Sequence, residues 1–499
     1  MPILGQNSPL RKLQLRASFK NVDHYEKPGY GLLPFDFARL QGGKTLIVNP
    51  AGEFRTIPTE SLQSVVEGTL PTSSEIYRDL ESIQAISNDV QLAGELVSNK
   101  VAAKQESLRE FTGLHIFVTT LRCDHTCQYC QVSRRNTGEG SYDMSKEHAE
   151  KALSWVFKSP RKVVKIEFQG GESMLNFTLI KWVVLRAKEL NKEHGKTIAF
   201  VIATNLTPLD EDILSFAEAH DLHFSTSLDG PESLHNANRP RPGKNSYQKA
   251  KDGILRIQER LGRDRVSALM TTTQKSLSMP KEIVDEYLSL GLDGIFLRPL
   301  SPYGFAIKTK SFKKYDSREW LKFYQEGLDY VIELNRQGIP FYEYYAGLLL
   351  KKMLSNRGTH YVDLQNPSGT AIGAIVFNYN GKIYGSDEGR MLAEMENEEL
   401  CLGHLDTDTY ESVYSGEKLL SLLDISMQEG SPGCDQCAFR HWCGSDPAYH
   451  IAMQQDPVGH KTFSGFCSRN MGLMKIIIDK LENGDDFTKK LFRAWAWRR

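Results

Sequence analysis

The chain has 499 residues, of which 40% are hydrophobic and 25% charged, and its formal net charge is −1. This balance is ordinary for a globular protein of about three domains and argues against general nucleic-acid or membrane-surface binding. No apolar run approaches the ~18 residues that span a bilayer, and no secretory signal is recognisable. Seven of the eight cysteines form two groups with metal-ligand spacing, which indicates a reducing, cytoplasmic location.

Residues 1–110 are predicted to form a separate α+β domain. Two strand-like segments flank the turn at Pro50–Gly52, and the first of three helical segments ends at Gly68, a typical helix stop. A hairpin followed by three helices resembles the small winged-helix unit that binds leader peptides in peptide-maturing systems. An N-terminal cap on the core is the alternative. The predicted strands are 45–49 and 53–57, and the predicted helices are 59–68, 73–86 and 91–109.

Residues 111–315 alternate short apolar strands with amphipathic helices, the pattern of a parallel sheet built from βαβ units. Six units are fewer than the eight of a closed barrel, so we expect an α/β fold with a partial (β/α)6, TIM-like barrel. The predicted strands are 115–120, 163–168, 199–203, 222–226, 266–271 and 294–298. The predicted helices are 145–157, 177–191, 209–220, 246–261 and 280–290.

Three cysteines follow the first of these strands with the spacing C-x3-C-x2-C: Cys123, Cys127 and Cys130. Closed zinc and iron–sulfur sites normally have four protein ligands. Three thiolates without a fourth close by therefore favour a cluster with one open iron. Taken alone, this spacing could also belong to half of a zinc site or arise by chance.

Polar or glycine-rich residues follow the other five predicted strands as well. Any one of these segments would be a simple turn in most proteins. Because ligands bind at the carboxyl ends of parallel strands, the six together predict one binding mouth around the cysteines. The segments are Gly170-Gly171-Glu172, Thr204-Asn205, Ser227-Leu228-Asp229-Gly230, Thr271–Thr273 and Arg298-Pro299.

A second cysteine group lies near the end of the chain. Residues 316–375 are predicted to be a helical linker region, with helices at 317–336 and 342–355, and residues 376–499 to be a C-terminal domain ending in a helix. This domain contains a complete four-ligand set for a [4Fe–4S] cluster or a structural zinc, and spacing alone does not choose between them. The set is Cys434, Cys437, Cys443 and Cys467.

The first cysteine run together with Gly-Gly-Glu resembles the signature of radical S-adenosylmethionine (SAM) enzymes. The C-terminal group is similar to the SPASM extension of radical SAM peptide maturases, which holds auxiliary [4Fe–4S] clusters. Over nearly the whole chain, the sequence resembles the maturases of His-Xaa-Ser peptide systems, for example in segments 165–172, 201–206, 225–231, 238–243 and 298–304.

The resemblance implies roles for particular residues. Cys123, Cys127 and Cys130 would hold the cluster whose open iron chelates SAM. Gly170, Gly171 and Glu172 would receive the SAM ammonium group, with the carboxylate as counter-charge. Tyr129 would contact the adenine, and Ser227 and Asp229 the methionine carboxylate or the ribose. Further candidates for the same pocket are Thr204, Asn205 and Arg241.

The resemblance also implies one auxiliary [4Fe–4S] cluster, held by Cys434, Cys437, Cys443 and Cys467. The family's second, proximal cluster lacks its cysteines here, because Ser386 or Asp387 and Asp446 stand where thiolates are expected. Carboxylates match iron–sulfur preference poorly. We therefore expect about eight irons per chain, not twelve, and Cys401 as a buried apolar thiol.

The implied activity is oxidative modification of a ribosomally made precursor peptide, such as a cross-link, after C–H abstraction by a 5′-deoxyadenosyl radical. Expected partners are a peptide with His-Xaa-Ser repeats, a flavodoxin or ferredoxin as electron donor, and a partner maturase. Asp387, Glu388 and Asp446 are candidates for the general base, although each also has a plain structural reading. One alternative is a sulfatase maturase that forms formylglycine. Another is a non-catalytic iron–sulfur or zinc scaffold that binds peptide.

Overall fold

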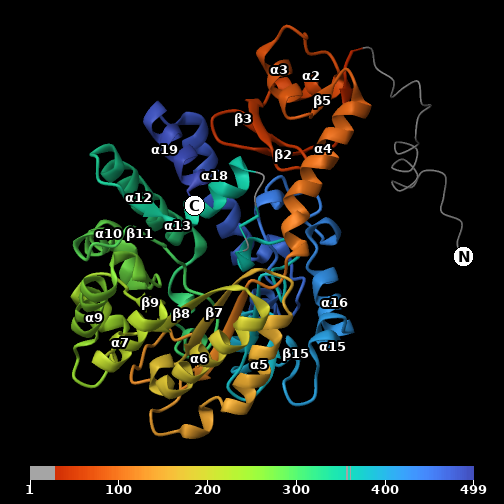
Figure 1. Cartoon of the computed structure of the whole chain (residues 1–499). Helices are drawn as coiled ribbons and strands as arrows, with labels where there is room; N and C mark the ends of the chain where they lie inside the picture. The colour runs from red at the N-terminus through yellow and green to blue at the C-terminus, as the bar shows by residue number, and fades with distance from the viewer. Residues whose placement is uncertain (1–28, 356–357, 360, 499) are drawn as a thin grey trace, which may run out of the picture. The chain divides into compact units, whose positions relative to one another are not determined.

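The computed structural model describes residues 29–355, 358–359 and 361–498 (Figure 1). The described residues fall into two compact units that divide after Val101. Helix α4, Val90–Gln105, runs through this division.

The first unit is built on a three-stranded antiparallel sheet with strand order β2-β3-β4. The predicted hairpin is present as β3 and β4, whereas β2 was not predicted because it is short and its residues alternate between half-buried and exposed. Gly68 ends helix α2 in the left-handed conformation, with φ = 69°. The elements are β1 Gly31–Leu32, β2 Asp36–Arg39, β3 Lys44–Val48, β4 Phe54–Pro58, α2 Ser61–Glu67, α3 Glu75–Ser82 and β5 Ile86–Ser87.

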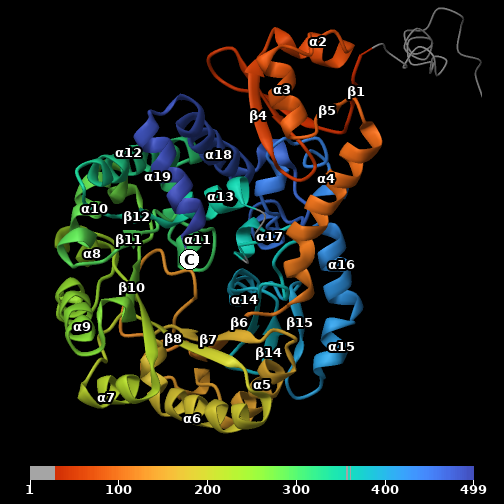
Figure 2. The same ribbon diagram turned by 45° about the horizontal axis from the view of Figure 1, so that its top comes forward.

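An eight-stranded sheet, in the order β10-β9-β8-β7-β6-β13-β14-β15, forms the centre of the second unit. Its first five strands are the first five predicted barrel strands, and all of them pair in parallel. The helices between them lie along the outer side of the curved sheet (Figure 2). The strands are β6 Leu114–Thr120, β7 Val163–Gly170, β8 Thr197–Thr204, β9 Leu222–Ser227 and β10 Val266–Leu269; the helices are α5 Lys146–Lys158, α6 Phe177–His194, α7 Glu211–His220, α8 Glu232–Asn238, α9 Ser246–Leu261 and α10 Pro280–Ser289.

The sixth predicted strand departs from the partial-barrel expectation. Strand β11, Gly294–Ile295, is only two residues long and pairs with β12, Tyr342–Glu343, in a separate parallel sheet. The buried carboxylate of Glu343 accepts the backbone N–H of Leu297 at 3.2 Å, which draws this segment toward β12. Its link to the main sheet runs through Thr272, whose backbone N and hydroxyl both donate to the carbonyl of Arg298.

A strand from the C-terminal region occupies the other edge of the barrel strands. Strand β13, Ala374–Phe377, pairs in parallel with β6, and β14, Lys382–Tyr384, and β15, Cys401–His404, continue the sheet in antiparallel fashion. This extension was not predicted. It joins the C-terminal cysteine region to the first barrel strand by backbone hydrogen bonds.

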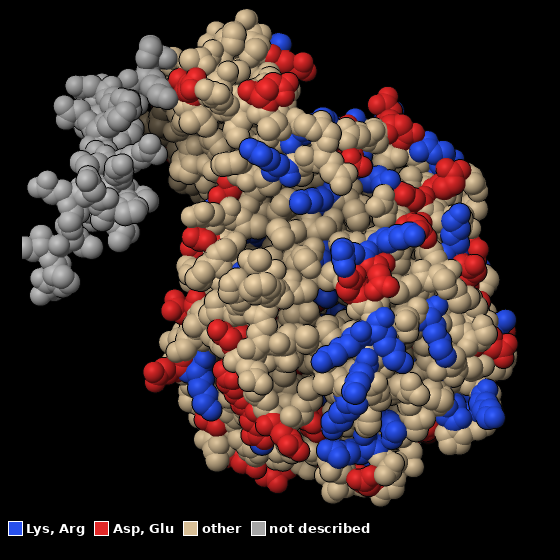
Figure 3. All heavy atoms as spheres, turned by 180° about the vertical axis from the view of Figure 1, so that it is seen from behind, with Lys and Arg blue, Asp and Glu red and all other residues tan. Residues whose placement is uncertain are grey.

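Helices supply most of the remaining structure. Helix α12 begins and ends as predicted, and Asp316 caps it by accepting the backbone N–H groups of Arg318 and Glu319. No helix in the described part of the chain is long and apolar enough to cross a bilayer. Both signs of charge are spread over the face in Figure 3. The helices are α11 Phe305–Lys308, α12 Ser317–Arg336, α13 Tyr344–Leu354, α14 Asp387–Ala393, α15 Tyr410–Tyr414, α16 Glu417–Ile425, α17 Pro447–Gln454, α18 Gly465–Asn483 and α19 Asp486–Trp497.

Candidate functional site

The loop after β6 brings the first three cysteines together. The backbone N–H of Cys123 bonds the carbonyl of Arg135, and that of Cys130 bonds the carbonyl of Cys127. Burial, opposed by the charge of Arg239 and assisted by the neighbouring Cys130, raises the pKa of the Cys127 thiol to about 12. Burial, and then the charge of Glu172, raise the pKa of the Cys123 thiol, and Cys127 and Cys130 add to this rise. The three thiols are therefore near enough to act on one another electrostatically, and three thiolates are the donor set expected for a cluster with one open position.

The glycine pair after β7 allows a very close approach to this cysteine loop. A side-chain carbon on Gly170 would lie 1.9 Å from the carbonyl oxygen of Thr120, and one on Gly171 would lie 2.4 Å from the carbonyl oxygens of Leu121 and Arg122. The N–H of Gly171 donates to the carbonyl of Thr120 at 2.8 Å, and the next N–H, of Glu172, donates to that of Arg122 at 2.7 Å. The glycines therefore hold the cysteine loop against the end of β7.

Glu172 is fully buried and its carboxylate already has protein partners. Oε1 accepts the N–H of Met174 at 3.0 Å and the hydroxyl of Thr204 at 2.7 Å, while Oε2 accepts the N–H of Asn205 at 2.7 Å. Burial raises the pKa of Glu172 to about 7, against the lowering effect of these hydrogen bonds. Glu172 thus ties the end of β7 to the end of β8, a role that the sequence did not reveal.

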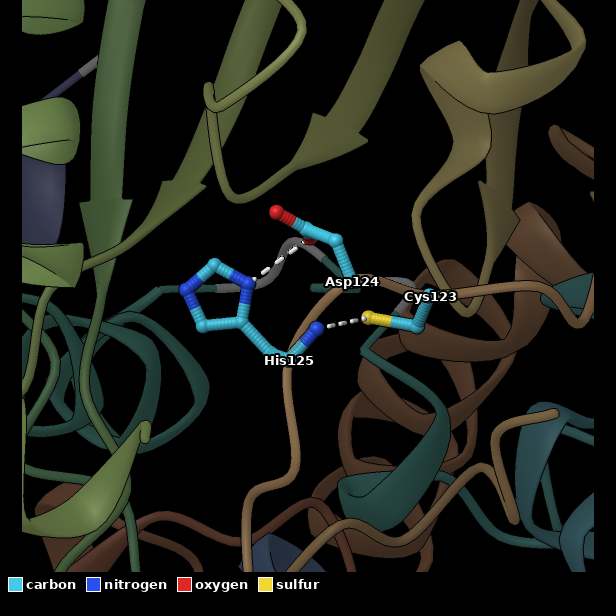
Figure 4. Close-up of side chains that lie close together, drawn as sticks. All are labelled: Cys123, Asp124 and His125. Atoms are coloured by element: carbon cyan, nitrogen blue, oxygen red, sulfur yellow. Dashed lines mark hydrogen bonds and ion pairs between the residues drawn. The ribbon is translucent and has the colours of Figure 1, made fainter. Parts of the chain in front are cut away.

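Asp124 and His125, between the cysteines, form a polar network that was not predicted. Oδ1 of Asp124 lies 2.8 Å from Nδ1 of His125 (Figure 4). The same oxygen accepts a hydrogen bond from Nδ2 of Asn205, also at 2.8 Å. Nε of Arg241 donates to Oδ2 at 3.3 Å. Burial alone would raise the pKa of Asp124, but hydrogen bonds from His125 and Asn205 and the charge of Arg241 lower it to about 2. The backbone N–H of His125 also lies 3.5 Å from Sγ of Cys123.

Tyr129 and Asp229 contact each other directly inside the protein. The hydroxyl of Tyr129 donates to Oδ2 of Asp229 at 2.5 Å, and Nε of Arg239 donates to Oδ1 at 3.2 Å. The Arg239 guanidinium also lies 5.4 Å from the centre of the Tyr129 ring. Sequence reasoning missed Arg239 and chose Arg241, two residues on. Ser227, at the end of β9, is half-buried, and its hydroxyl has no protein partner among the described residues.

The three candidate bases separate into two environments. Asp387 is paired with the fully buried Arg390, whose Nε and Nη2 both donate to Oδ1. Glu388 and Asp446 instead line a cavity of about 20 Å³, room for about one water molecule. Burial, then the charges of Asp363, Asp387 and Asp446, raise the pKa of Glu388 to about 8. Burial and Asp363 raise the pKa of Asp446 to about 7.

The cavity wall carries charges of both signs from distant parts of the chain. Among the described residues, no direct ion pair joins any two of its charged side chains, and Nε of Arg469 is buried without a hydrogen-bond partner. Buried charges are usually paired or hydrated. The charged residues of the wall are Arg298, Asp363, Glu388, Asp446 and Arg469, and its other residues include Tyr345, Tyr361 and Tyr449.

The second cysteine group also converges. Cys434 and Cys437 lie in consecutive turns, Cys443 follows a short 3-10 helix at Arg440–Trp442, and Cys467 lies in the first turn of α18. Burial raises the pKa of Cys467 to about 12, and the other three cysteines all add to the rise. Four thiols that act on one another electrostatically are a donor set for a [4Fe–4S] cluster or zinc. Cys401 was expected to be a buried apolar thiol, but it is only half-buried; it packs beside Tyr384, and its Sγ lies 3.5 Å from the carbonyl of Gly403.

His148, His404 and Asp406 place their ligand atoms within 4.8 Å of one another. Hydrogen bonds account for this group. Nδ1 of His404 accepts the N–H of Asp406 at 3.1 Å, so Nε2 donates to the carbonyl of Asn380 at 2.9 Å and no lone pair remains for a metal. Nζ of Lys151 also donates to Asp406 at 2.7 Å, so the negative charge of this carboxylate is already balanced without a metal ion.

Residues 117–287 match the model of the Radical SAM superfamily, and the chain therefore contains a radical SAM domain in this region. The matched segment begins in β6, includes all three cysteines of the first group and ends in α10.

Two relatives are similar in sequence to parts of this chain. The uncharacterised protein MJ0907 of Methanocaldococcus jannaschii is 28% identical over 191 residues, which cover 38% of this chain and 62% of the relative. A serine-type anaerobic sulfatase-maturating enzyme of Klebsiella aerogenes is 22% identical over 389 residues, which cover 75% of this chain and 87% of that enzyme.

Two solved structures share the fold over most of the chain. The structure of anSMEcpe with bound AdoMet is 16% identical, with a TM-score of 0.61, and the match covers 77% of this chain and 98% of that one. Streptococcus suis SuiB bound to its precursor peptide SuiA is also 16% identical, with a TM-score of 0.51, and the match covers 88% and 99% of the two chains.

Proposed function

We propose that this chain is a radical SAM peptide maturase of the SPASM type, acting in the cytoplasm. The observation that carries the proposal is the contact of the loop that bears Cys123, Cys127 and Cys130 with the ends of β7, β8 and β9, inside the matched radical SAM domain. Peptides are bound in two structures with the same fold, SuiB with SuiA and anSMEcpe with a Cp18Cys peptide. These likenesses support a peptide substrate for this chain.

The three thiols fit a [4Fe–4S] cluster with one open iron. When bound together with SAM, such a cluster supplies the one-electron cleavage that yields methionine and a 5′-deoxyadenosyl radical. The chain's own residues hold the cysteine loop in place: Gly170 and Gly171 fix its backbone, and Glu172 joins the adjacent strand ends. The protein's contribution is thus to position the loop and to keep water away from it.

The proposed SAM pocket lies at these strand ends. The Ser227 hydroxyl, which has no protein partner among the described residues, is the side chain best prepared to bind the methionine carboxylate or the ribose. Tyr129, Asp229, Thr204, Asn205 and Arg241 each have a protein partner, so we assign them to shaping the pocket as well as to contacting SAM. The negative charge of Glu172 would attract the SAM ammonium group from a distance, and the backbone of Gly170 and Gly171 would contact it.

Glu388 and Asp446 are the proposed proton acceptors for bond formation, because they line the cavity while Asp387 is held by Arg390. A carboxyl group whose pKa lies near neutrality can exchange a proton at the working pH. A [4Fe–4S] cluster on Cys434, Cys437, Cys443 and Cys467 would supply the acceptor for the electron that an oxidative bond formation releases. We propose that this is the only auxiliary cluster.

The proposed substrate is a ribosomally made precursor peptide, with His-Xaa-Ser repeats as the specific expectation, and the proposed modification is a cross-link. A flavodoxin or ferredoxin would provide the reducing electron, and a second maturase could take part. The hairpin and helices of residues 29–101 would dock the leader of the peptide, since sheet edges accept extended peptides.

A second candidate function is formylglycine formation on a sulfatase. The observation in its favour is the 22% identity to the Klebsiella aerogenes enzyme over 87% of that enzyme's length. The two functions differ in product: formylglycine changes the mass of one serine or cysteine residue, whereas a cross-link removes two hydrogens and resists separation of the linked residues. Tandem mass spectrometry of the treated peptide distinguishes them.

The first experiment measures 5′-deoxyadenosine after anaerobic reconstitution with iron and sulfide, in the presence of SAM and a strong reductant. We expect product from the wild type and none from Cys127→Ala. Absence of product from a wild-type protein with filled clusters would contradict the proposal and favour a metal-binding peptide scaffold.

A further inference from the structure

Among the four C-terminal cysteines, Cys443 has distinctive neighbours. Nδ2 of Asn470, on helix α18, points at its Sγ from 3.6 Å, within the range of an N–H···S hydrogen bond. Asn470 is only 1% exposed to solvent, so water does not compete for this amide.

Tyr345 holds Asn470 in this orientation. Its hydroxyl lies 3.4 Å from Oδ1 of Asn470, and Tyr345 is itself 3% exposed. Because the carbonyl end of the amide accepts this hydroxyl, the N–H₂ end is turned toward Cys443. Tyr345 also lines the charged cavity, so the hydrogen bonds run continuously from the cavity wall to the cysteine sulfur.

A cation lies behind the same cysteine. Nζ of Lys352, on helix α13, donates to the carbonyl of Cys443 at 3.3 Å and also to the carbonyl of Leu364. The side chain is thereby fixed with its charge beside Cys443. Asn470 and Lys352 come from helices that are far apart in the sequence, and both act on one corner of the four-thiol site.

Reduction adds a negative charge to an iron–sulfur cluster. N–H···S hydrogen bonds and nearby positive charge stabilise the reduced form and so raise the reduction potential. A higher potential makes a cluster a better electron acceptor. The chemistry of oxidative bond formation requires such an acceptor near the place where the substrate loses its electron.

We propose that Asn470 and Lys352 are positioning residues that raise the reduction potential of the C-terminal cluster through Cys443, with Tyr345 orienting Asn470. This inference rests on the proposed function in one respect, the presence of a [4Fe–4S] cluster on these four cysteines. It adds that the Cys443 corner is the side on which the cluster receives an electron from the cavity.

The test is a potentiometric titration followed by electron paramagnetic resonance. The three cysteines 123, 127 and 130 are replaced by alanine, so that the signal comes from the C-terminal cluster alone. In this background, Asn470→Leu removes the N–H donor and Lys352→Met removes the charge, each at similar size. We expect each change to shift the reduction equilibrium about tenfold toward the oxidised cluster, which lowers a one-electron potential by about 59 mV.

Matched controls come from the same helices. Asn483 is the last residue of α18, and Lys351 directly precedes Lys352 on α13. Neither Asn483→Leu nor Lys351→Met should change the reduction potential of the C-terminal cluster. Tyr345→Phe keeps Asn470 but removes the hydroxyl that orients its amide. This variant should lower the reduction potential by less than Asn470→Leu does. This variant keeps the test decisive if Asn470→Leu does not fold.

Potentials of Asn470→Leu, Lys352→Met and Tyr345→Phe that match the controls would overturn the inference. Zinc in place of iron at the C-terminal site of the wild type would overturn it as well. Neither of these two measurements requires SAM or peptide. The proposed function is tested separately, by 5′-deoxyadenosine formation in the wild type.

Discussion

The hydroxyl of Tyr129 donates a hydrogen bond of 2.5 Å to Oδ2 of Asp229, which lies in the loop after a strand three positions away in the sheet. Arg239 completes the group on the other carboxylate oxygen. This buried cluster connects the cysteine loop to the end of β9. It holds the cysteine loop and the proposed SAM pocket in one fixed arrangement.

Replacing Asp229 by Asn should therefore destabilise the protein strongly. The change leaves the buried Arg239 charge unpaired, which costs about 3–5 kcal/mol of unfolding free energy. Tyr129→Phe removes one hydrogen bond to a charged group and should cost about 1.5–3 kcal/mol. Denaturant unfolding measures both. Tyr330→Phe is the control, because Tyr330 makes a similar bond to Asp285 on the exposed surface; an equal loss there would contradict the argument.

Gly171→Ala should disrupt the first cluster and spare the second. A side-chain carbon at this position would lie 2.4 Å from two backbone carbonyl oxygens of the cysteine loop, so the loop must move. We expect the iron content to fall from about eight to about four per chain and 5′-deoxyadenosine formation to be lost. Gly138→Ala, in the same loop, has nothing within 4 Å and should change neither quantity.

Glu388 should make the protein less stable as the pH rises. Its pKa is raised to about 8 in the folded state from an ordinary value of 4.5, so the folded state binds the proton more tightly. Stability from this group is complete below about pH 4.5 and is lost as the pH rises to about 8.

Glu388→Gln should therefore flatten the fall of the melting temperature between pH 5 and 8. Glu193→Gln, on an exposed position, is the control. Equal pH slopes for the wild type and Glu388→Gln would contradict the placement of Glu388 among buried carboxylates.

Cys401→Ser should leave the iron content at about eight per chain, whereas Cys443→Ser should lower it to about four. The reason is location: Cys401 packs beside Tyr384, away from the four converging thiols. Inductively coupled plasma mass spectrometry measures both. Loss of iron from Cys401→Ser would reveal a further iron site that includes this thiol.

The strands of the barrel could be predicted from sequence because each is a short apolar run between turn residues. The sixth strand was predicted as well, but the pairing of β11 with β12 was not, because Glu343 from a distant segment decides it. β13 could not be predicted, because its parallel partner β6 lies far away in the chain. Both features depend on contacts that no local pattern records.

The candidate site was predictable at the level of cysteines and strand ends, and less so for the roles of single residues. Glycines 170 and 171 were expected to admit a ligand, yet the backbone that they admit belongs to the cysteine loop. Arg239 and Arg241 look alike in the sequence, and only the fold shows that the first pairs with Asp229 and the second with Asp124.

The pairing of β13 with β6 also constrains the synthesis of the protein. Leu114 leaves the ribosome about 260 residues before its partner Ala374. At 5–20 residues per second, one edge of the nascent sheet stays open for roughly ten to fifty seconds. An unpaired edge of apolar strand is a template for aggregation. Slow translation before residue 374 should therefore lower the yield of folded protein, and a chaperone that covers this edge should restore it.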